Sequence, residues 1–327
     1  MDFFTAIGLL VVLYLFVYLV ILSFADCDVG LLWAEKFGKN IDTLKGKVVW
    51  ITGASSGIGE YLAYVLAKHG AKLIISARNE TNLNKVKQKC VENGCSTENI
   101  LVLPMDVSKI SEHKIYFDKC IHHFGRLDIL VNNAGRSQRA TWEDIEIDVD
   151  REIFELNVFS AISLSRLAVK YFNKQDSGHI VVTSSVAGLF GVPFSASYTG
   201  SKHALQGYFE SLRYEKNLEL NVTLLCPGPV FSNILFESHT AKAGEKFQEA
   251  HSPVDKRMST DRCANLCAIA IANKLDEAWM GLFPIIPLTY ILRYFPSSAR
   301  ILMKLLGLKK LQKLRDNKET VGIDKSQ

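Results

Sequence analysis

The stretch Lys47-Val48-Val49-Trp50-Ile51-Thr52-Gly53-Ala54-Ser55-Ser56-Gly57-Ile58-Gly59 decides the fold of this 327-residue chain. Its first half is a short apolar run rich in β-branched residues, which predicts a buried strand. Its second half is a glycine-rich turn, and the apolar spacing that follows it predicts a helix. Such a turn lets the backbone approach a pyrophosphate at a helix N-terminus, although the glycines could also only tighten the turn. The expected nucleotide contacts are Thr52, Gly53, Ser55, Ser56, Gly57, Ile58 and Gly59.

The second predicted strand, residues 72–78, ends in Ala77 and Arg78. An acidic residue at this place in a dinucleotide-binding fold holds the ribose 2′-hydroxyl of NAD. Here no carboxylate would repel a 2′-phosphate, and the guanidinium of Arg78 suits one. The sequence therefore predicts NADP(H) as the cofactor. The alternative is that Arg78 is a solvated loop residue.

Strands and helices alternate along most of the chain. Further strands are expected at residues 100–104, 127–131, 178–185, 222–226 and 278–283, with helices between them. This alternation predicts the α/β class, with a single doubly wound parallel-sheet domain of Rossmann type. We assign four regions: an N-terminal membrane anchor (1–28), a linker (29–46), the Rossmann-type domain (47–283), and a C-terminal extension and tail (284–327).

The carboxyl ends of parallel strands meet at one edge of the sheet, where ligands bind in this class of fold. Asp106 follows the third strand, where it could accept a hydrogen bond from an adenine amino group or cap the next helix. Asparagines after the fourth strand could alternatively stabilise a turn. The remaining expected cofactor contacts at this edge are Asn133, Ala134, Gly135, Pro227, Gly228, Val230 and Ser232.

Tyr198 and Lys202 stand four residues apart at the start of a predicted helix. Positions four apart share a helix face, so the phenol and the ammonium should lie side by side. A neighbouring cation favours the phenolate, and such a tyrosine can exchange a proton near neutral pH. Asn157 lies in the middle of a long helix predicted from residue 149 to residue 172, where asparagine is mildly unfavourable. Either Asn157 is exposed, or its side chain or a local kink serves a site.

Taken together, these motifs resemble the short-chain dehydrogenase/reductase family over residues 47 to 283. The resemblance includes Asn157, Ser185, Tyr198-x-x-x-Lys202 and Pro227-Gly228, in order and at the family's spacing. The N-terminal segment and the stretch from Cys226 to Val230 look most like the branch called dehydrogenase/reductase member 7. That branch is membrane-associated in the endoplasmic reticulum and acts on lipophilic carbonyls and alcohols such as steroids and retinoids.

The resemblance implies a mechanism. Tyr198 would be the general acid in reduction and the base in oxidation, and Lys202 would lower its pKa and hold the nicotinamide ribose. Ser185 would hydrogen-bond the substrate oxygen, so that Ser185 and Tyr198 are the expected substrate contacts. Asn157 would keep a water that relays protons. A catalytically idle NADPH-binding membrane scaffold is the alternative, which the intact set of four residues argues against. The family is often dimeric, so a homodimer is possible.

Both ends of the chain suggest contact with membrane lipid. Residues 3–25 contain no charge and are long enough as a helix to cross a bilayer, which favours an uncleaved anchor over a cleaved signal peptide. Lysines and leucines alternate at helical spacing between residues 304 and 315, as in a helix on a membrane surface. A dimer contact or a covered core helix would give the same pattern. The last dozen residues look disordered.

Composition excludes several classes of function. The chain is 48% hydrophobic and 22% charged, and its net charge of +4 is not gathered into a basic stripe that would favour nucleic acid. Its seven cysteines form no C-x-x-C pair, and no nearby histidine completes a zinc site, so no metal is expected. We interpret them as reduced and mostly buried thiols.

Overall fold

The computed structural model describes residues 2–215, 220–316 and 321. Within these residues, seven strands form one parallel sheet in the order β3-β2-β1-β4-β5-β6-β7. This order confirms the predicted doubly wound sheet of Rossmann type. The strands are β1 (Val48–Thr52), β2 (Lys72–Ser76), β3 (Ile100–Val102), β4 (Ile129–Asn132), β5 (Gly178–Thr183), β6 (Leu220–Pro227) and β7 (Glu277–Met280).

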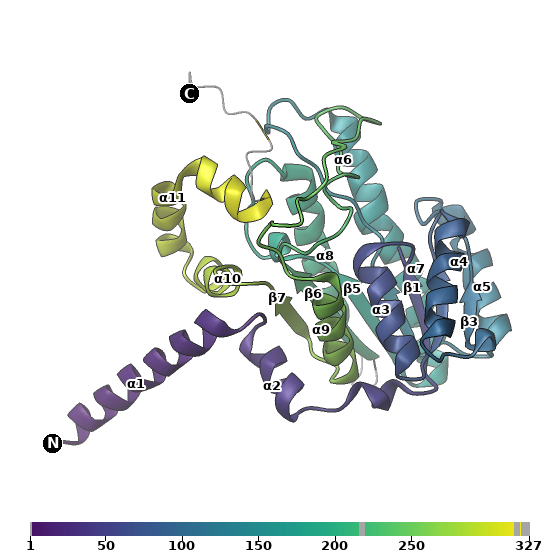
Figure 1. Cartoon of the computed structure of the whole chain (residues 1–327), viewed down its shortest axis with the longest axis horizontal. Helices are drawn as coiled ribbons and strands as arrows, with labels where there is room; N and C mark the ends of the chain where they lie inside the picture. The colour runs from purple at the N-terminus through teal and green to yellow at the C-terminus, as the bar shows by residue number, and fades with distance from the viewer. Residues whose placement is uncertain (1, 216–219, 317–320, 322–327) are drawn as a thin grey trace.

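Helices cover both faces of the sheet (Figure 1), with α3, α4 and α9 on one side and α5, α7 and α8 on the other. The helices of the sheet domain are α3 (Gly57–Lys68), α4 (Glu80–Glu92), α5 (His113–Phe124), α6 (Ile147–Phe154), α7 (Ser160–Gln175), α8 (Ala196–Glu215) and α9 (Thr260–Ala272). Outside it lie α1 (Phe3–Phe24), α2 (Val29–Phe37), α10 (Ile285–Tyr294) and α11 (Pro296–Asp316).

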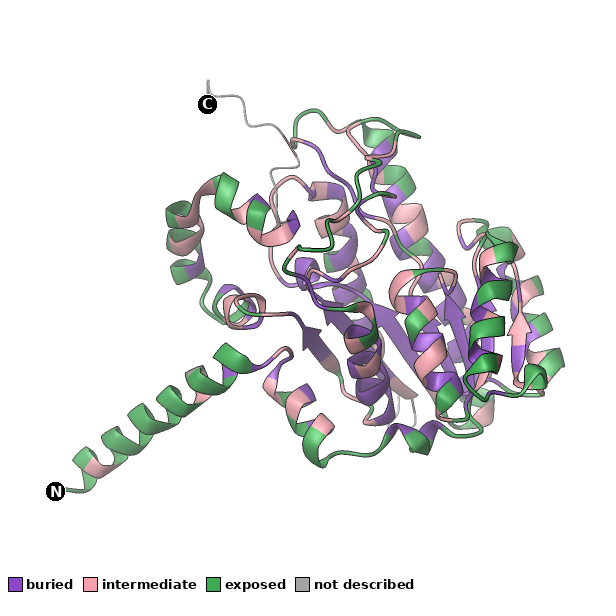
Figure 2. Cartoon of the chain, in the orientation of Figure 1, coloured by how far each residue is buried: buried purple, intermediate pink, exposed green. Residues whose placement is uncertain are grey.

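The side chains of β1 show why this sequence needs a layer of helices on each face of the sheet. Val49 and Ile51 join the apolar cluster under α3 and α9, whereas Val48 and Trp50 join the cluster under α5 and α7. Successive residues of a strand point to opposite faces, so a strand that is apolar at every position must be covered twice. Figure 2 shows the result as buried strands between helices that are exposed only on their outer sides.

The predicted boundaries need small corrections. The third strand ends at Val102 and the fifth at Thr183, although the N–H groups of Leu103 and Met105 still donate to the carbonyls of Ile75 and Ala77, both at 3.0 Å. The fourth strand begins at Ile129 and the last ends at Met280, after which the N–H of Gly281 donates to the carbonyl of Asp26 instead. The long helix expected from residue 149 to residue 172 is interrupted by a π-helical turn, η4 (Glu155–Phe159), which separates α6 from α7.

The N-terminal helix α1 is the one described helix that is long and apolar enough to cross a membrane. Residues 29–46, expected to be a linker, are instead structured: they form α2 and the 3-10 turn η1 (Ile41–Leu44), and both contribute to the core beside α9. Asp28 receives hydrogen bonds from the N–H groups of Leu31 and Trp279, at 3.0 and 2.6 Å. The segment after α1 is therefore joined directly to the edge strand β7.

The C-terminal extension forms α10 and α11. Gly307 interrupts α11 with φ 70° and ψ 158°, a backbone conformation that glycine adopts without steric cost. One side of the last turns of α11 is buried, since Gln312 and Asp316 are almost inaccessible to solvent while Lys313 is exposed. Apolar side chains earlier in α11, such as Ile301 and Leu305, remain exposed. The predicted disorder of the last dozen residues concerns positions that lie almost entirely outside the described residues.

Candidate active site

A cavity of about 880 Å³ lies at the carboxyl edge of the sheet. Most of the predicted site residues line it, and three do not: Thr52, Gly59 and Asn157. The predicted residues that line it are Gly53, Ser55, Ser56, Gly57, Ile58, Arg78, Asp106, Asn133, Ala134, Gly135, Ser185, Tyr198, Lys202, Pro227, Gly228, Val230 and Ser232.

The glycine-rich turn between β1 and α3 has the conformation that its composition predicts. Gly53 and Gly57 have φ angles of 65° and 59°, in the left-handed region. A Cβ at Gly53 would lie 2.8 Å from the Cα of Ala134, and one at Gly59 would lie 2.4 Å from Nδ2 of Asn133. Only glycine lets the turn approach the β4 loop this closely, and α3 begins at Gly57 with its N-terminus at the cavity. The turn therefore fits a pyrophosphate.

Thr52 and Asn133 connect the β1 turn to the β4 loop. The Thr52 hydroxyl accepts hydrogen bonds from the N–H groups of Asn133 and Ala134, at 3.0 and 3.2 Å. The Asn133 amide donates to the carbonyls of Thr52 and Gly53, at 3.1 and 3.2 Å. The Asn133 side chain therefore stabilises the turn, as the simpler interpretation of these asparagines expected. Thr52 and Gly59 lie outside the cavity lining and support the turn, and their contact with a cofactor stays a prediction.

Charged groups lie where β2 and β3 end. Arg78 is exposed at the cavity, and Asp106 accepts hydrogen bonds from the N–H and hydroxyl of Ser108, at 3.0 and 2.7 Å. Asp106 therefore stabilises the turn before α5 and also faces the cavity. Arg136, which the sequence did not single out, also lines the cavity. Burial lowers the pKa of Arg136, and the nearby positive charge of Arg78 lowers it further. Two guanidinium groups thus act on the same part of the cavity.

Ser185, Tyr198 and Lys202 all line the cavity. The Lys202 ammonium is buried, donates a hydrogen bond to the carbonyl of Thr183 at 2.8 Å, and lies 5.6 Å from the centre of the Tyr198 ring. Ser185, at the end of β5, donates from its hydroxyl to the carbonyl of Pro227 at 3.1 Å. The predicted helix face of Tyr198 and Lys202 is thereby brought against the ends of β5 and β6.

The protein alone does not give Tyr198 the lowered pKa that its neighbour Lys202 suggested. Burial raises the pKa of the phenol, and a hydrogen bond with Ser185 and the positive charge of Arg139 oppose this only in part. The Lys202 cation is itself buried and hydrogen-bonded to a carbonyl, and burial lowers its pKa to about 8. Removing water from the phenolate costs more free energy than these partners return.

Asn157 holds the site together from behind rather than lining it. Its Nδ2 donates to the carbonyl of Arg136 and to the hydroxyl of Ser201, both at 2.9 Å, and its Oδ1 accepts from the N–H of Arg136 at 2.8 Å. The π-helical turn presents this amide, so Asn157 is buried at a local distortion of the helix, and its role in the site stays a prediction. A Cβ at Gly135 would lie 3.2 Å from Oδ1 of Asn157 and 3.5 Å from the Lys202 ammonium. A larger residue there would therefore press on the Asn157 amide.

A family model described as short chain dehydrogenase matches residues 47–243. The chain is also 40% identical over 299 residues to dehydrogenase/reductase SDR family member 7 of Homo sapiens, an alignment that covers 89% of this chain and 87% of the human protein. The chain belongs to the short-chain dehydrogenase family. It is therefore related to oxidoreductases, and its resemblance to the member 7 branch is confirmed.

The chain is also similar to proteins outside the member 7 branch. It is 35% identical over 209 residues to 11-beta-hydroxysteroid dehydrogenase-like 2 of Arabidopsis thaliana, covering 64% of this chain and 67% of the relative. An alcohol dehydrogenase from the archaeon Thermococcus sibiricus, complexed with 5-hydroxy-NADP, matches with a TM-score of 0.63 and 24% identity over 73% of this chain and 97% of its own. A short-chain dehydrogenase/reductase from Burkholderia phymatum, in complex with NAD, matches with a TM-score of 0.66 and 24% identity over 79% and 93%. These two structures support the fold.

Sequence reasoning missed most of the substrate end of the cavity. The loop between β6 and α9 lines it through Ile234 among others. The C-terminal helices also line it, although the sequence had suggested a membrane surface for them. Their amphipathic spacing was the available signal, but it does not say what the apolar face covers. The cavity residues that were missed on these helices are Ile285, Leu288, Leu292, Met303, Leu311, Leu314, Arg315 and Asp316.

Proposed function

We propose that this chain is an NADP(H)-dependent oxidoreductase that interconverts a carbonyl and an alcohol on a lipophilic substrate, with Tyr198 as the acid and base. The observation that carries the proposal is the meeting of Ser185, Tyr198 and Lys202 in the cavity that the glycine-rich turn also lines. The nicotinamide would supply or accept the hydride, and its oxidised ring would add positive charge near the phenol.

Each residue of the site has a chemical task. Tyr198 would donate its phenolic proton to the substrate oxygen in reduction and accept one in oxidation. The Ser185 hydroxyl would donate a hydrogen bond to that oxygen, where negative charge develops. Lys202, held by the Thr183 carbonyl, would keep a cation beside the tyrosine ring. Asn157 would position the β4 loop and α8 against each other through its hydrogen bonds, and a water held next to it would connect Lys202 to solvent.

Charge at the end of β2 supports NADP(H) over NAD(H). Arg78 lies at the cavity, and the position before it is Ala77 instead of a carboxylate. A guanidinium binds a 2′-phosphate through charge-assisted hydrogen bonds. The positive charge of Arg78 lowers the pKa of Arg136, which indicates that the two guanidinium groups lie in the same region of the cavity.

The lining of the substrate end supports a lipophilic substrate. Leucines from α10 and α11 line the same cavity as Phe190 and Ile234. Apolar surface of this extent favours a large carbon skeleton over a small polar carbonyl compound. The names of the relatives include 11-beta-hydroxysteroid dehydrogenases, so ketosteroids and hydroxysteroids are the first substrates to test, followed by retinoids and xenobiotic carbonyls.

Tyr198→Phe tests the proposed chemistry. We expect the variant to lose turnover of a ketosteroid with NADPH by a factor of about 10³ or more, because the phenylalanine ring cannot transfer a proton. Tyr208→Phe is the matched control, since Tyr208 is an exposed tyrosine on the same helix. NADPH oxidation is followed by absorbance, and NADPH binding by fluorescence. Equal turnover in the two variants would refute the role of Tyr198, and NADPH binding without any turnover in the unaltered protein would favour the scaffold alternative.

We further propose that α1 anchors the enzyme in the endoplasmic reticulum membrane as a single pass, with α11 contacting lipid. The apolar length of α1 and the exposed Ile301 and Leu305 on α11 support this proposal. Deleting residues 3–24 should leave part of the protein in the membrane fraction, which centrifugation after alkaline extraction would measure. Complete release into the soluble fraction would refute a second lipid contact. A homodimer through α7 and α8 remains part of the proposal and is testable by light scattering in detergent.

A further inference from the structure

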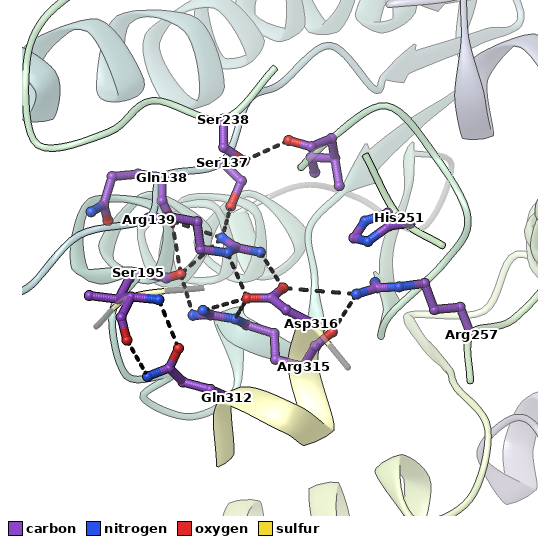
Figure 3. A network of polar contacts seen from close by, with 12 residues as sticks. Ser137, Gln138, Arg139, Ser195, Ser238, His251, Arg257, Gln312, Arg315 and Asp316 are labelled. Atoms are coloured by element: carbon purple, nitrogen blue, oxygen red, sulfur yellow. Dashed lines mark hydrogen bonds and ion pairs between the residues drawn. The ribbon is translucent and has the colours of Figure 1, made fainter. Parts of the chain in front are cut away.

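A buried cluster of charges lies at the end of α11 (Figure 3). The side chain of Asp316 is inaccessible to solvent, and its two carboxylate oxygens accept hydrogen bonds from Nε and Nη2 of Arg139, both at 3.0 Å. Nε and Nη2 of Arg315 contact the same carboxylate at 2.7 and 2.6 Å. The Nη2 atom of Arg257 lies 3.9 Å from it. One buried carboxylate therefore faces three guanidinium groups.

The cluster joins four parts of the chain that are distant in sequence. Arg139 belongs to the loop after β4 and also donates to the hydroxyl of Ser195, at 3.0 Å. Arg315 donates to the same hydroxyl at 2.8 Å. Arg257, in the loop that covers the substrate end, donates to the carbonyl of Arg315 at 2.9 Å. Ser195 lies immediately before α8, the helix that carries Tyr198, so the end of α11 is fixed to the frame of the catalytic site.

Asp316 is the residue that makes the contact of the end of α11 with the sheet domain favourable; we call this contact the docking of α11. Burial alone would raise the pKa of its carboxyl, but Arg139 and Arg315 hold the pKa well below its usual range. Removing the negative charge would leave buried guanidinium groups facing one another, which is far more costly than losing an exposed ion pair. The described carboxylates of α11 consist of Asp316 alone, so the helix offers no substitute.

The docked half of α11 forms one wall of the cavity. Leu311 and Leu314 line it, one turn before Asp316, together with Leu288 and Leu292 of α10. The break at Gly307 permits this half of the helix to change direction and return to the sheet domain, as the yellow end of α11 does in Figure 1. The helix would otherwise continue away from the cavity.

We propose that Asp316 is a positioning residue that fixes α11 as a wall of the substrate cavity and thereby makes the enzyme select large apolar carbonyl compounds. The inference rests on the proposed function, because it concerns the substrate end of the same site. On this inference, a substrate of one ring would need little of the wall, whereas a four-ring skeleton held at Ser185 and Tyr198 would extend along it. Loss of docking should therefore affect the two substrates differently.

Asp316→Asn tests the inference in the full-length protein, with Asp148→Asn as control, because Asp148 forms an exposed ion pair with Arg151. We expect amide hydrogen exchange in residues 308–316 to accelerate about tenfold or more in Asp316→Asn, since the helix end loses its buried contacts. The KM of a four-ring ketosteroid should rise about tenfold, with little change in kcat for a one-ring aromatic aldehyde. The control should change neither measurement.

A double substitution distinguishes the leucines of α11 that line the cavity from the charge cluster that holds the helix end. Leu311→Ala with Leu314→Ala should raise the ketosteroid KM while leaving exchange at Asp316 unchanged, because the charge cluster stays intact. Unchanged exchange in Asp316→Asn would overturn the inference, as would an equal loss of kcat for both substrates. If the unaltered protein reduces neither compound, the proposed function fails. In that case ketosteroid binding, measured by equilibrium dialysis, must still weaken in Asp316→Asn for the inference to stand.

Discussion

Replacing Asn157 by alanine removes the amide that connects the π-helical turn to its surroundings. The Asn157 side chain is about 1% exposed and makes three hydrogen bonds of 2.8–2.9 Å, two of them to the N–H and carbonyl of Arg136. A buried backbone group left without a partner costs about 1–3 kcal/mol. Two such groups, with some access to water, predict that the free energy of unfolding falls by about 2–4 kcal/mol.

This loss is measurable by thermal unfolding. A destabilisation of about 2–4 kcal/mol lowers the Tm of a domain of this size by about 5–15 °C. The measurement uses circular dichroism of the full chain in detergent, without cofactor, so that nucleotide binding does not contribute. Asn84→Ala on the exposed surface of α4 is the control, and it should shift the free energy of unfolding by less than about 0.5 kcal/mol.

If Asn157→Ala loses activity and yet has the same Tm as the unaltered protein, the amide is not a structural support, and the reasoning is refuted. Its contribution would then lie in the proton relay alone. If both Tm and activity fall, the support is real. Restoring the fold at low temperature should then recover part of the turnover.

Two further predictions concern the cofactor end of the site. Burial lowers the pKa of Lys202 to about 8, so the ammonium loses its proton as pH rises through that value. The kcat/KM for carbonyl reduction should therefore fall above pH 8 in a steady-state pH profile. Lys202→Arg should move this fall to higher pH. Arg78→Ala should raise the KM for NADPH about 10–100-fold and leave that for NADH nearly unchanged, since only a 2′-phosphate loses a charged hydrogen bond. A matching rise for NADH would contradict this assignment of Arg78.

Local patterns were sufficient to predict the sheet and most of the residues that gather around the cavity at its carboxyl edge. The strand and turn from Val48 to Gly59 are encoded by apolar runs and by glycines whose conformation other residues avoid. The pairing of Tyr198 with Lys202 followed from helical spacing alone. Their pKa values did not follow, because burial depends on the whole cavity, and it outweighs the effect of one neighbouring charge on the phenol.

Features that depend on contacts between distant residues could not be predicted. The helix break at Asn157 is stabilised by Arg136 and Ser201, which are 21 and 44 positions away. The direction of α11 is decided by the pairing of Asp316 with Arg139 across 177 positions. Before these partners are known, the leucine spacing of α11 is equally compatible with a lipid surface, a dimer contact or the wall of a cavity.

The joint between α1 and the sheet domain has little freedom. Only four residues separate the two helices α1 and α2, and among them Asp28 is bonded to β7 while Asp26 accepts two hydrogen bonds from Arg262, at 2.8 and 2.9 Å. Arg262 also pairs with Glu35 of α2. A bilayer crossed by α1 would consequently dictate the tilt and height of the whole catalytic body. Compounds dissolved in the lipid would then meet the enzyme in one orientation at every collision.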